Sequence, residues 1–197
     1  MINLPPDLEL ILASQSPRRL DLLRRIGLRP HVEPAHIHEE PFTEGDPEDY
    51  AIDLAREKAQ VIAQRYPKAL VVGADTIVVV DRHVLGKPVD EKDAAAMLQT
   101  LANRWHIVNT AYCLTHLSRN IEVTGVEATR VHFRALSPAE IAAYIATGSP
   151  MDKAGAYGIQ DGSALFVDRI EGCFYNVVGF PLAHFGQSMQ RVLAQLS

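Results

Sequence analysis

The chain has 197 residues, enough to bury a substantial hydrophobic core in one large domain or two small lobes. Hydrophobic residues make up 47% and charged residues 22% of the chain, which is typical of an ordinary globular protein. The formal net charge of −5 excludes the basic surface that drives non-specific nucleic-acid binding. Any anionic ligand must therefore be bound by a local cluster of cations.

Two further features predict a cytoplasmic protein. The N-terminal stretch MINLPPDLELILAS has no basic segment, and its apolar run is too short and too closely flanked by acids for a signal peptide or a membrane span. The two cysteines, Cys113 and Cys173, fit neither a C-x-x-C motif nor a disulfide framework, which favours a reducing compartment. We therefore expect a cytoplasmic protein that binds neither a membrane nor nucleic acid.

The first predicted supersecondary unit is a strand, a tight turn and a helix. Leu8–Ala13 has the length and aliphatic content of a strand. Leucines then recur with helical spacing after Arg19, until Gly27 ends the segment as a C-cap would. Ser16 is the expected N-cap, and Pro17 occupies the first helical position, where proline is preferred.

The start of this helix predicts a phosphate site. A helix N-terminus offers unpaired N–H groups and the positive end of a dipole to an anion. Arg18 and Arg19 stand in the first turn, where acidic residues are usually preferred. A bound phosphate would supply the missing negative charge, and arginine forks match phosphate oxygens. The alternative is that both arginines are solvated on a surface helix.

A polar segment, His31–Asp46, leads from this unit to a second helix. His36 and His38 lie in the segment, but without further nitrogen or sulfur ligands at fixed spacing they are better interpreted as solvated loop residues than as metal ligands. The second helix is expected over Asp46–Arg65, with Asp46 as its N-cap. Lys58 in this helix would by default be a surface lysine.

The stretch Ala69–Asp81, ALVVGADTIVVVD, indicates a buried central strand that polar residues interrupt. Asp75 and Thr76 stand in its middle. An ionised carboxylate in a β-branched run costs several kcal/mol unless a cation or a metal compensates it, and such conflicts between local pattern and fold mark functional sites. The alternative is a structural carboxylate that accepts backbone N–H groups where the strand breaks at Gly73.

The rest of the chain alternates helices and strands. Further helices are expected over Glu91–Leu101, Ser137–Thr147 and Leu182–Leu196, and strands over Trp105–Leu117, Ile121–Phe133, Ala164–Val167 and Asn176–Val178. A short arm over Val84–Asp90 would present Lys87 in an extended conformation, because the residue before a proline avoids the helical region. The glycines of Met151–Gln160, MDKAGAYGIQ, permit close approach of a ligand to the backbone; the alternative is a glycine-rich connection with a structural salt bridge.

Polar residues interrupt the apolar pattern at the ends of the predicted strands. They are Ser14, Ser16, Arg18, Arg19, Glu39, Lys58, Asp75, Thr76, Lys87, Asp152, Lys153 and Gln160. Several cations with a few carboxylates match a site for a polyphosphate and a divalent metal, since carboxylate oxygens are the ligands that Mg²⁺ prefers. The chain has no GxxxxGK[ST] or GxGxxG motif, so neither a P-loop nor a Rossmann site is expected.

At these residues the sequence resembles the Maf family of nucleoside triphosphate pyrophosphatases. The matching segments are LILASQSPRRLDLL, REKA, VVGADTIVV, LGKPVD, SPAEI, MDKAGAYGIQ and IEGCFYNVVGFPL, in the family's order over nearly the whole chain. The resemblance implies a single Maf-like domain over residues 1–197 with a two-lobed α/β fold, Maf/ITPase-like, in which helices flank a mixed twisted sheet around a central cleft. It also implies a homodimer.

The resemblance further implies hydrolysis of a nucleoside triphosphate between its α and β phosphates, with a divalent cation, Mg²⁺ or Mn²⁺. Asp75 matches the family's proton acceptor, and Thr76, Arg18 and Gln160 match positions assigned to substrate selection. Other matching polar positions are Ser14, Arg19, Glu39, Lys58, Lys87, Asp152 and Lys153. The YGIQ ending resembles the branch that acts on dTTP and UTP, and not the branch that acts on 7-methyl-GTP.

These matches lead to a mechanistic hypothesis. The cations Arg18, Arg19, Lys58 and Lys87 would bind the triphosphate, and the carboxylates Glu39, Asp75 and Asp152 would hold the metal. Gln160 offers an amide donor and a carbonyl acceptor, which match the O4 and N3–H edge shared by uracil and thymine, whereas cytosine reverses that pattern.

Departures from the family pattern are local, and they lie at Asn103–Trp105, Ala111, Phe180 and Asp161. Asp161 follows Gln160 where the family prefers glycine, and it adds a negative charge beside the proposed base-reading residue. Two other functions remain open. One is a nucleotide-binding regulator of cell division without turnover, and the other is a pyrophosphatase for non-standard purine nucleotides such as ITP.

Overall fold

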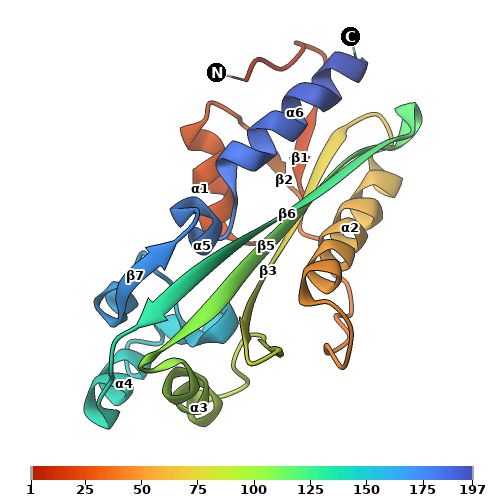
Figure 1. Ribbon diagram of the computed structural model, residues 1–197. Coiled ribbons are helices and arrows are strands. Elements are labelled where there is room, and N and C mark those ends of the chain that lie inside the picture. Colours follow the sequence, from red (N-terminus) through yellow and green to blue (C-terminus); the bar gives the residue numbers. More distant parts are fainter. Residues whose placement is uncertain (1, 197) are drawn as a thin grey trace. The chain divides into compact units, whose positions relative to one another are not determined.

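The computed structural model describes residues 2–196, whose strands form one mixed sheet of seven strands (Figure 1). The strand order is β2-β1-β3-β5-β6-β7, and β4 pairs with β3. The strands are β1 (Leu10–Leu12), β2 (His31–Val32), β3 (Leu70–Val80), β4 (His83–Leu85), β5 (Arg104–His116), β6 (Ile121–Phe133) and β7 (Val167–Glu171). β1 runs parallel to β2 and β3, whereas the pairs β3–β4 and β6–β7 are antiparallel.

Helices flank this sheet, which confirms the predicted α/β class. They are α1 (Pro17–Arg25), α2 (Pro47–Arg65), α3 (Glu91–Leu101), α4 (Pro138–Ile145), α5 (Phe174–Val178) and α6 (Leu182–Leu196). Figure 1 shows α2 and α6 on opposite sides of the strands. Among residues 2–196, no helix is long and apolar enough to cross a membrane. The central cleft stays a prediction.

The chain divides into two compact units, which we describe separately. Among the described residues, unit 1 comprises 2–75, 110–127 and 179–196, and unit 2 comprises 76–109 and 128–178. The strands β3, β5 and β6 each contribute residues to both units. Unit 1 thus includes Asp75, and unit 2 begins at the next residue, Thr76.

In unit 1, α2 packs against β3 at unusually short range. The buried face of α2 carries alanines at every fourth position, Ala51, Ala55, Ala59 and Ala63. Opposite them, β3 has Gly73, at which a Cβ atom would lie 2.1 Å from the carbonyl oxygen of Ala55 and 2.7 Å from the amide nitrogen of Ala59. Only a glycine fits at this position. The small residues on both elements therefore set the distance between α2 and β3.

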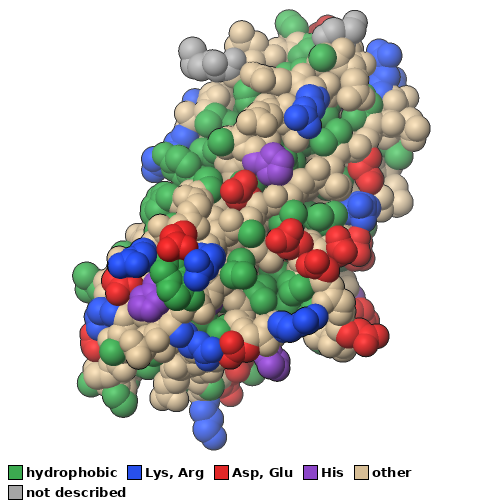
Figure 2. Space-filling model, viewed as in Figure 1, with side chains coloured by type: hydrophobic (Ala, Val, Ile, Leu, Met, Phe, Trp, Pro, Cys, Tyr) green, Lys and Arg blue, Asp and Glu red, His purple; other side chains and the backbone are tan. Residues whose placement is uncertain are grey.

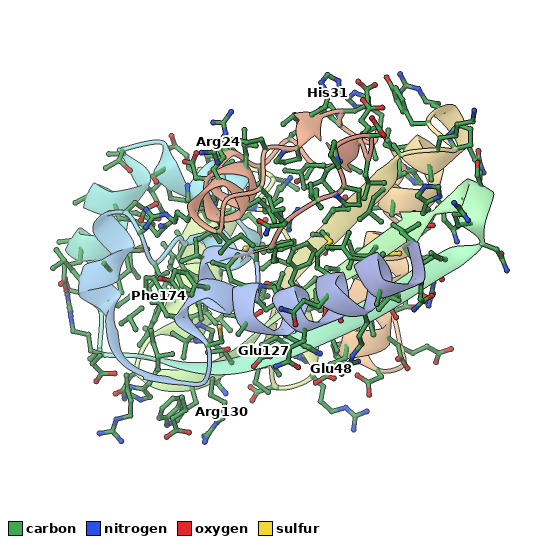
Figure 3. All side chains as sticks on the ribbon, turned by 90° about the horizontal axis from the view of Figure 1, so that it is seen from above. Arg24, His31, Glu48, Glu127, Arg130 and Phe174 are labelled. Carbon is green, nitrogen blue, oxygen red and sulfur yellow. The ribbon has the colours of Figure 1, made fainter. Side chains whose placement is uncertain are left out.

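Helix α6 packs on the part of β5 that belongs to unit 1. The Tyr112 ring lies 5.5 Å from the Phe185 ring, and its hydroxyl is 2.9 Å from Ser188 Oγ. Figures 1 and 3 both show α6 running along the strands. A Cβ at Gly125 of β6 would lie 2.5 Å from the Tyr112 hydroxyl, so a glycine there makes room for the ring. All of these residues belong to unit 1.

The core of unit 2 contains a buried polar pair. His106 Nε2 lies 2.8 Å from the Tyr157 hydroxyl, and the Phe133 and Tyr157 rings are 4.8 Å apart. Burial lowers the pKa of His106 to about 3, so its imidazole is neutral at physiological pH. The pair holds the segment that contains Tyr157 against β5.

Charged side chains cover the outer surface of β6 and β7 in unit 2. Arg130 pairs with Glu171 at 2.6 Å, and His132 pairs with Asp168 at 2.6 Å. Figure 2 shows basic, acidic and histidine side chains gathered over this strand pair, and Figure 3 shows Arg130 pointing outward. Arg130 and Glu171 stand opposite each other in the β6–β7 register. Opposite charges in such cross-strand positions add modestly to sheet stability, so we interpret this surface as structural.

Most of the predicted elements are confirmed. Ser16 caps α1, Asp46 caps α2, and Ser137 forms the expected capping box with Glu140 at the start of α4. β6 and α6 have the predicted bounds of Ile121–Phe133 and Leu182–Leu196.

Two predicted strands are wrong. Ala164–Val167 lies mainly in a 3₁₀ helix, Gly162–Phe166, which the Asp161 side chain caps, and β7 begins only at Val167. Asn176–Val178 belongs to helix α5 instead of a strand. There the Asn176 amide donates to the Val108 carbonyl and to Thr129 Oγ1, and these tertiary bonds override the strand preference of the two valines.

Candidate active site

The turn between β1 and α1 is organised by Arg19. Its Nη1 donates to Ser14 Oγ at 3.0 Å and to the carbonyl oxygen of Ala74 at 2.9 Å, and its Nε donates to the carbonyl oxygen of Gly179 at 3.1 Å. Ser14 Oγ also accepts the amide of Ser16 at 3.2 Å. Burial lowers the pKa of Arg19, and the negative charge of Asp75 opposes that effect. Arg19 therefore joins the turn, the residue before Asp75 and the segment that leads to α6.

Lys58 lies between two carboxylates of unit 1. Its Nζ is 2.6 Å from Asp75 Oδ1 and 2.7 Å from Glu39 Oε1. The Lys58 side chain is only 12% exposed, so it is not the surface lysine that its sequence context alone would indicate. The close packing of α2 on Gly73 puts Lys58 within reach of Asp75, which lies two residues further along β3. The cation that a buried Asp75 requires is thus Lys58.

Asp75 has the ionisation properties of a buried acid with cationic neighbours. The residue is 8% exposed. Burial raises the pKa of Asp75, and the charges of Lys58 and Arg19 and the hydrogen bond from Lys58 oppose that rise without cancelling it. A carboxylate with a raised pKa accepts a proton more readily than an ordinary aspartate, which suits a general base.

Tyr50 holds the loop that carries Glu39. Its hydroxyl donates to the carbonyl oxygen of Glu40 at 2.8 Å, and the Phe42 ring lies 5.4 Å from the Tyr50 ring. Burial and the negative charges of Asp75 and Glu39 raise the pKa of Tyr50. No motif in the sequence indicates this contact, because the Tyr50 hydroxyl bonds to a backbone oxygen of the loop, which any residue could supply.

The two carboxylates beside Lys58 have the chemistry of a site for a hard divalent cation. Glu39 and Asp75 both direct an oxygen to the same nitrogen, and Mg²⁺ is commonly bound by one or two carboxylates together with substrate phosphates. Within residues 2–196, no group of three or more histidine, cysteine or acidic side chains is arranged to hold a metal ion. The predicted set of Glu39, Asp75 and Asp152 therefore stays a prediction.

In unit 2, the arm that carries Lys87 is joined to the glycine-rich segment. The Gly155 amide donates to the carbonyl oxygen of Gly86 at 2.9 Å. Gly155 has a φ of +64°, and a Cβ there would lie 2.9 Å from a methyl carbon of Val78 in β3. The glycine is thus needed for both its conformation and its close approach to the strand. Lys87 is exposed, and Thr76 in β3 is half-buried.

Lys153 is held by several oxygens of the same segment. Its Nζ donates to the Ser149 carbonyl, pairs with Asp152 Oδ1 at 2.6 Å and lies 3.5 Å from Asp161 Oδ2. The lysine side chain is 12% exposed, whereas the neighbouring Gln160 is exposed. The structural salt bridge that is one of the two interpretations of this segment is therefore present.

The structure divides the predicted site residues between the two units. In unit 1 lie Ser14, Ser16, Arg18, Arg19, Glu39, Lys58 and Asp75, and in unit 2 lie Thr76, Lys87, Asp152, Lys153 and Gln160. The hydrogen bonds and ion pairs described above join Ser14 to Arg19, Glu39 and Asp75 to Lys58, and Asp152 to Lys153.

Known proteins resemble this chain over most of its length. The family model described as Maf-like protein matches residues 9–192. A dTTP/UTP pyrophosphatase from Koribacter versatilis is 51% identical over 182 residues, which cover 92% of this chain and 93% of the relative. Another from Thermococcus onnurineus is 51% identical over 174 residues, covering 88% of this chain and 92% of the relative.

Among solved structures, a nucleoside-triphosphatase, dITP/XTP pyrophosphatase, from Mycobacterium abscessus aligns with a TM-score of 0.47 and 16% identity, covering 96% of this chain and 98% of that one. The family match spans almost the entire chain and includes the segments around Asp75, Lys58 and Gln160. This chain therefore belongs to the family of Maf-like proteins.

Proposed function

We propose that this protein is a nucleoside triphosphate pyrophosphatase that hydrolyses dTTP and UTP to the monophosphate and pyrophosphate. The observation that carries the proposal is the buried Asp75, whose pKa burial raises and which pairs with Lys58 at 2.6 Å. A protein that only binds nucleotides needs cations but has no use for a buried base. The names of the relatives that are about 50% identical support the choice of substrates.

In this proposal Asp75 is the general base. Its carboxylate accepts a proton from a water molecule as the water oxygen forms a bond to the α-phosphorus. The bond from that phosphorus to the bridging oxygen of the β-phosphate breaks, pyrophosphate leaves, and the proton passes from Asp75 to solvent. General-base catalysis of this kind contributes roughly 10²- to 10⁴-fold to a rate.

Glu39 and Asp75 would hold a divalent cation, either Mg²⁺ or Mn²⁺. Such a cation neutralises phosphate charge and orients phosphate oxygens. The Lys58 Nζ pairs with both carboxylates, at 2.6 Å from Asp75 and 2.7 Å from Glu39, so their oxygens lie around one point as oxygen ligands of a cation would. We include Asp152 as a third candidate ligand from unit 2.

The remaining site residues would bind the phosphates and the base. Ser14, Arg18, Arg19, Lys58, Lys87 and Lys153 are the proposed contacts for the triphosphate, and Thr76 and Gln160 those for the nucleoside. Gln160 is exposed, so its amide is accessible to a base. Its donor and acceptor match uracil and thymine and mismatch cytosine. The cytoplasmic location and the homodimer remain predictions.

The test is pyrophosphate release by the wild type and by Asp75→Asn, with dTTP, UTP, CTP, GTP, ITP and 7-methyl-GTP and with Mg²⁺ or Mn²⁺. Asn keeps the shape of the side chain but cannot act as a base. We expect turnover of dTTP and UTP that falls by about 10² or more in the variant.

The other outcomes each select a different function. Preferential turnover of ITP over UTP would make the protein a pyrophosphatase for non-standard purine nucleotides. Nucleotide binding by the wild type without release of pyrophosphate from any nucleotide would make it a regulator, and Asp75 would then be a structural acid.

A further inference from the structure

Asp161 follows the exposed Gln160 and is the acceptor of several hydrogen bonds from neighbouring elements. Its Oδ1 accepts the amide of Ser163 at 3.0 Å, and its carboxylate accepts the Tyr144 hydroxyl at 3.1 Å and the Ser149 hydroxyl. Its Oδ2 lies 3.5 Å from Lys153 Nζ. A single carboxylate thus joins α4, the residues around Ser149, Lys153 and the 3₁₀ helix that begins at Gly162.

These contacts close the turn that carries Gln160. The Asp161 amide donates to the carbonyl oxygen of Gly158 at 3.0 Å, so Gln160 lies inside a four-residue turn. Ser163 Oγ accepts the Gly158 amide at 3.1 Å and donates to the Gly158 carbonyl at 2.8 Å. Asp161 caps the helix that contains Ser163. Asp161 and Ser163 therefore fix the two ends of the turn.

Lys153 packs across the same turn. A Cβ at Gly158 would lie 2.6 Å from Lys153 Cε and 3.3 Å from Asp161 Oδ2, so the lysine stem fills the space beside the glycine. The Asp161 carboxylate lies within ion-pair distance of the ammonium group at the end of that stem. Asp161 therefore contacts both the turn that contains Gln160 and the ammonium group of Lys153.

The negative charge of Asp161 is compensated locally. Burial would raise the pKa of Asp161, but the donors from Ser149, Ser163 and Tyr144 outweigh that effect and hold the pKa below its usual value. The carboxylate is therefore ionised throughout the neutral range, with Lys153 as a nearby counter-charge.

We propose that Asp161 is a positioning residue for specificity. It fixes the turn that presents Gln160 to the base and the ammonium group of Lys153, and so sets the preference for uracil and thymine over cytosine. The proposal rests on the proposed function of this site. It assigns to Asp161 no contact with the substrate.

The experiment compares the kinetics of UTP and CTP hydrolysis in the wild type, Asp161→Ala and Asp161→Asn. Because Asp161→Ala removes several bonds to a charged group, we expect KM for UTP to rise about tenfold and the UTP:CTP ratio of kcat/KM to fall about tenfold. We expect kcat for UTP to change by less than about threefold, since the base and its partners in unit 1 are untouched. Asp161→Asn keeps an oxygen that accepts the Ser163 amide, so it should retain most of the preference.

The matched control is Asp168→Ala, which removes a carboxylate from the same unit, where it lies 2.6 Å from His132 Nδ1 at the surface. It should leave both the UTP:CTP ratio and KM unchanged. Ser163→Ala, which removes the bonds to Gly158, should change the ratio in the same direction as Asp161→Ala. This variant also keeps the proposal testable if Asp161→Ala fails to fold.

Amide hydrogen exchange over residues 158–163 gives a readout that does not depend on turnover. We expect exchange to accelerate about tenfold or more in Asp161→Ala and to stay at the wild-type rate in Asp168→Ala. An active wild type whose UTP:CTP ratio and exchange rates are the same in Asp161→Ala would overturn the positioning role alone. A wild type that releases no pyrophosphate would overturn the proposed function, and the specificity role with it.

Discussion

Lys58 controls the ionisation of Asp75 because its ammonium group is the nearest compensating charge. Burial raises the pKa of Asp75, and Lys58 is the largest of the effects that lower it. The base acts when it is deprotonated, so kcat/KM should rise with pH as Asp75 loses its proton. In Lys58→Met the opposing charge is gone, and the pKa of Asp75 must rise further. We expect the acidic limb of the pH–rate profile to move to higher pH by about one unit or more.

The control for this prediction is Lys68→Met, which removes an exposed lysine just before β3. Its pH–rate profile should coincide with that of the wild type. If the acidic limb of Lys58→Met stays where the wild type has it, then the ionisation seen in the profile does not belong to Asp75.

The candidate chemistry was predictable at the level of residue types, but the contacts were not. Asp75 stood out in the sequence because an acid in an apolar strand conflicts with its surroundings. The ion pair of Asp75 with Lys58 depends on Gly73 in β3 and on the row of alanines on α2. Neither feature has a charge or a motif by which the sequence could indicate it. The contacts of Asp161 could not be predicted for a similar reason, because no motif links it to its partners Tyr144 and Ser149.

At the scale of elements, the close packing of α2 on β3 positions Lys58. Gly73→Ala would place a methyl group 2.1 Å from the Ala55 carbonyl oxygen, so the helix must move away from the strand. Overpacking of this kind costs about 1–3 kcal/mol, which corresponds to a fall in Tm of roughly 2–12 °C for a chain of this size. We also expect kcat to fall, because Lys58 moves with α2. Thermal unfolding and UTP turnover measure the two effects.

Gly186→Ala is the matched control, since a Cβ at this position of α6 would meet no atom within 4 Å. Alanine is the better helix former, so this variant should be as stable as the wild type or slightly more stable. Unchanged Tm and kcat in Gly73→Ala would contradict this prediction, because α2 would then accommodate the added methyl group without displacing Lys58.

Elements with strong local signals were predicted well, and those determined by tertiary contacts were not. The caps of α1, α2 and α4 are encoded by a serine or aspartate followed by proline, and these bonds form within a few residues. β2 has only two residues and exists through its pairing with β1, so no periodicity could indicate it. Helix α5 contradicts its local preference because the Asn176 amide bonds to residues far along the chain.

At the scale of the whole molecule, the two units share continuous strands. The backbone of β3, β5 and β6 passes from one unit into the other. In β3 the boundary falls between Asp75 of unit 1 and Thr76 of unit 2. Unfolding one unit would therefore end three strands in mid-course and leave backbone groups of the other without their partners. This continuity predicts one cooperative unfolding transition for the described chain.

The single tryptophan, Trp105, belongs to unit 2 and can report on a change made in unit 1. Ile62→Val removes one methylene from the core of unit 1, at a side chain that is fully buried in α2, and should cost about 1 kcal/mol. If the units unfold together, the Tm followed by Trp105 fluorescence should fall by roughly 2–4 °C, in step with the Tm followed by far-UV circular dichroism. Val89→Ala, at a side chain that is 86% exposed, should leave both values unchanged. If the Tm followed by fluorescence is unchanged in Ile62→Val while the Tm followed by circular dichroism falls, the two units unfold independently despite their shared strands.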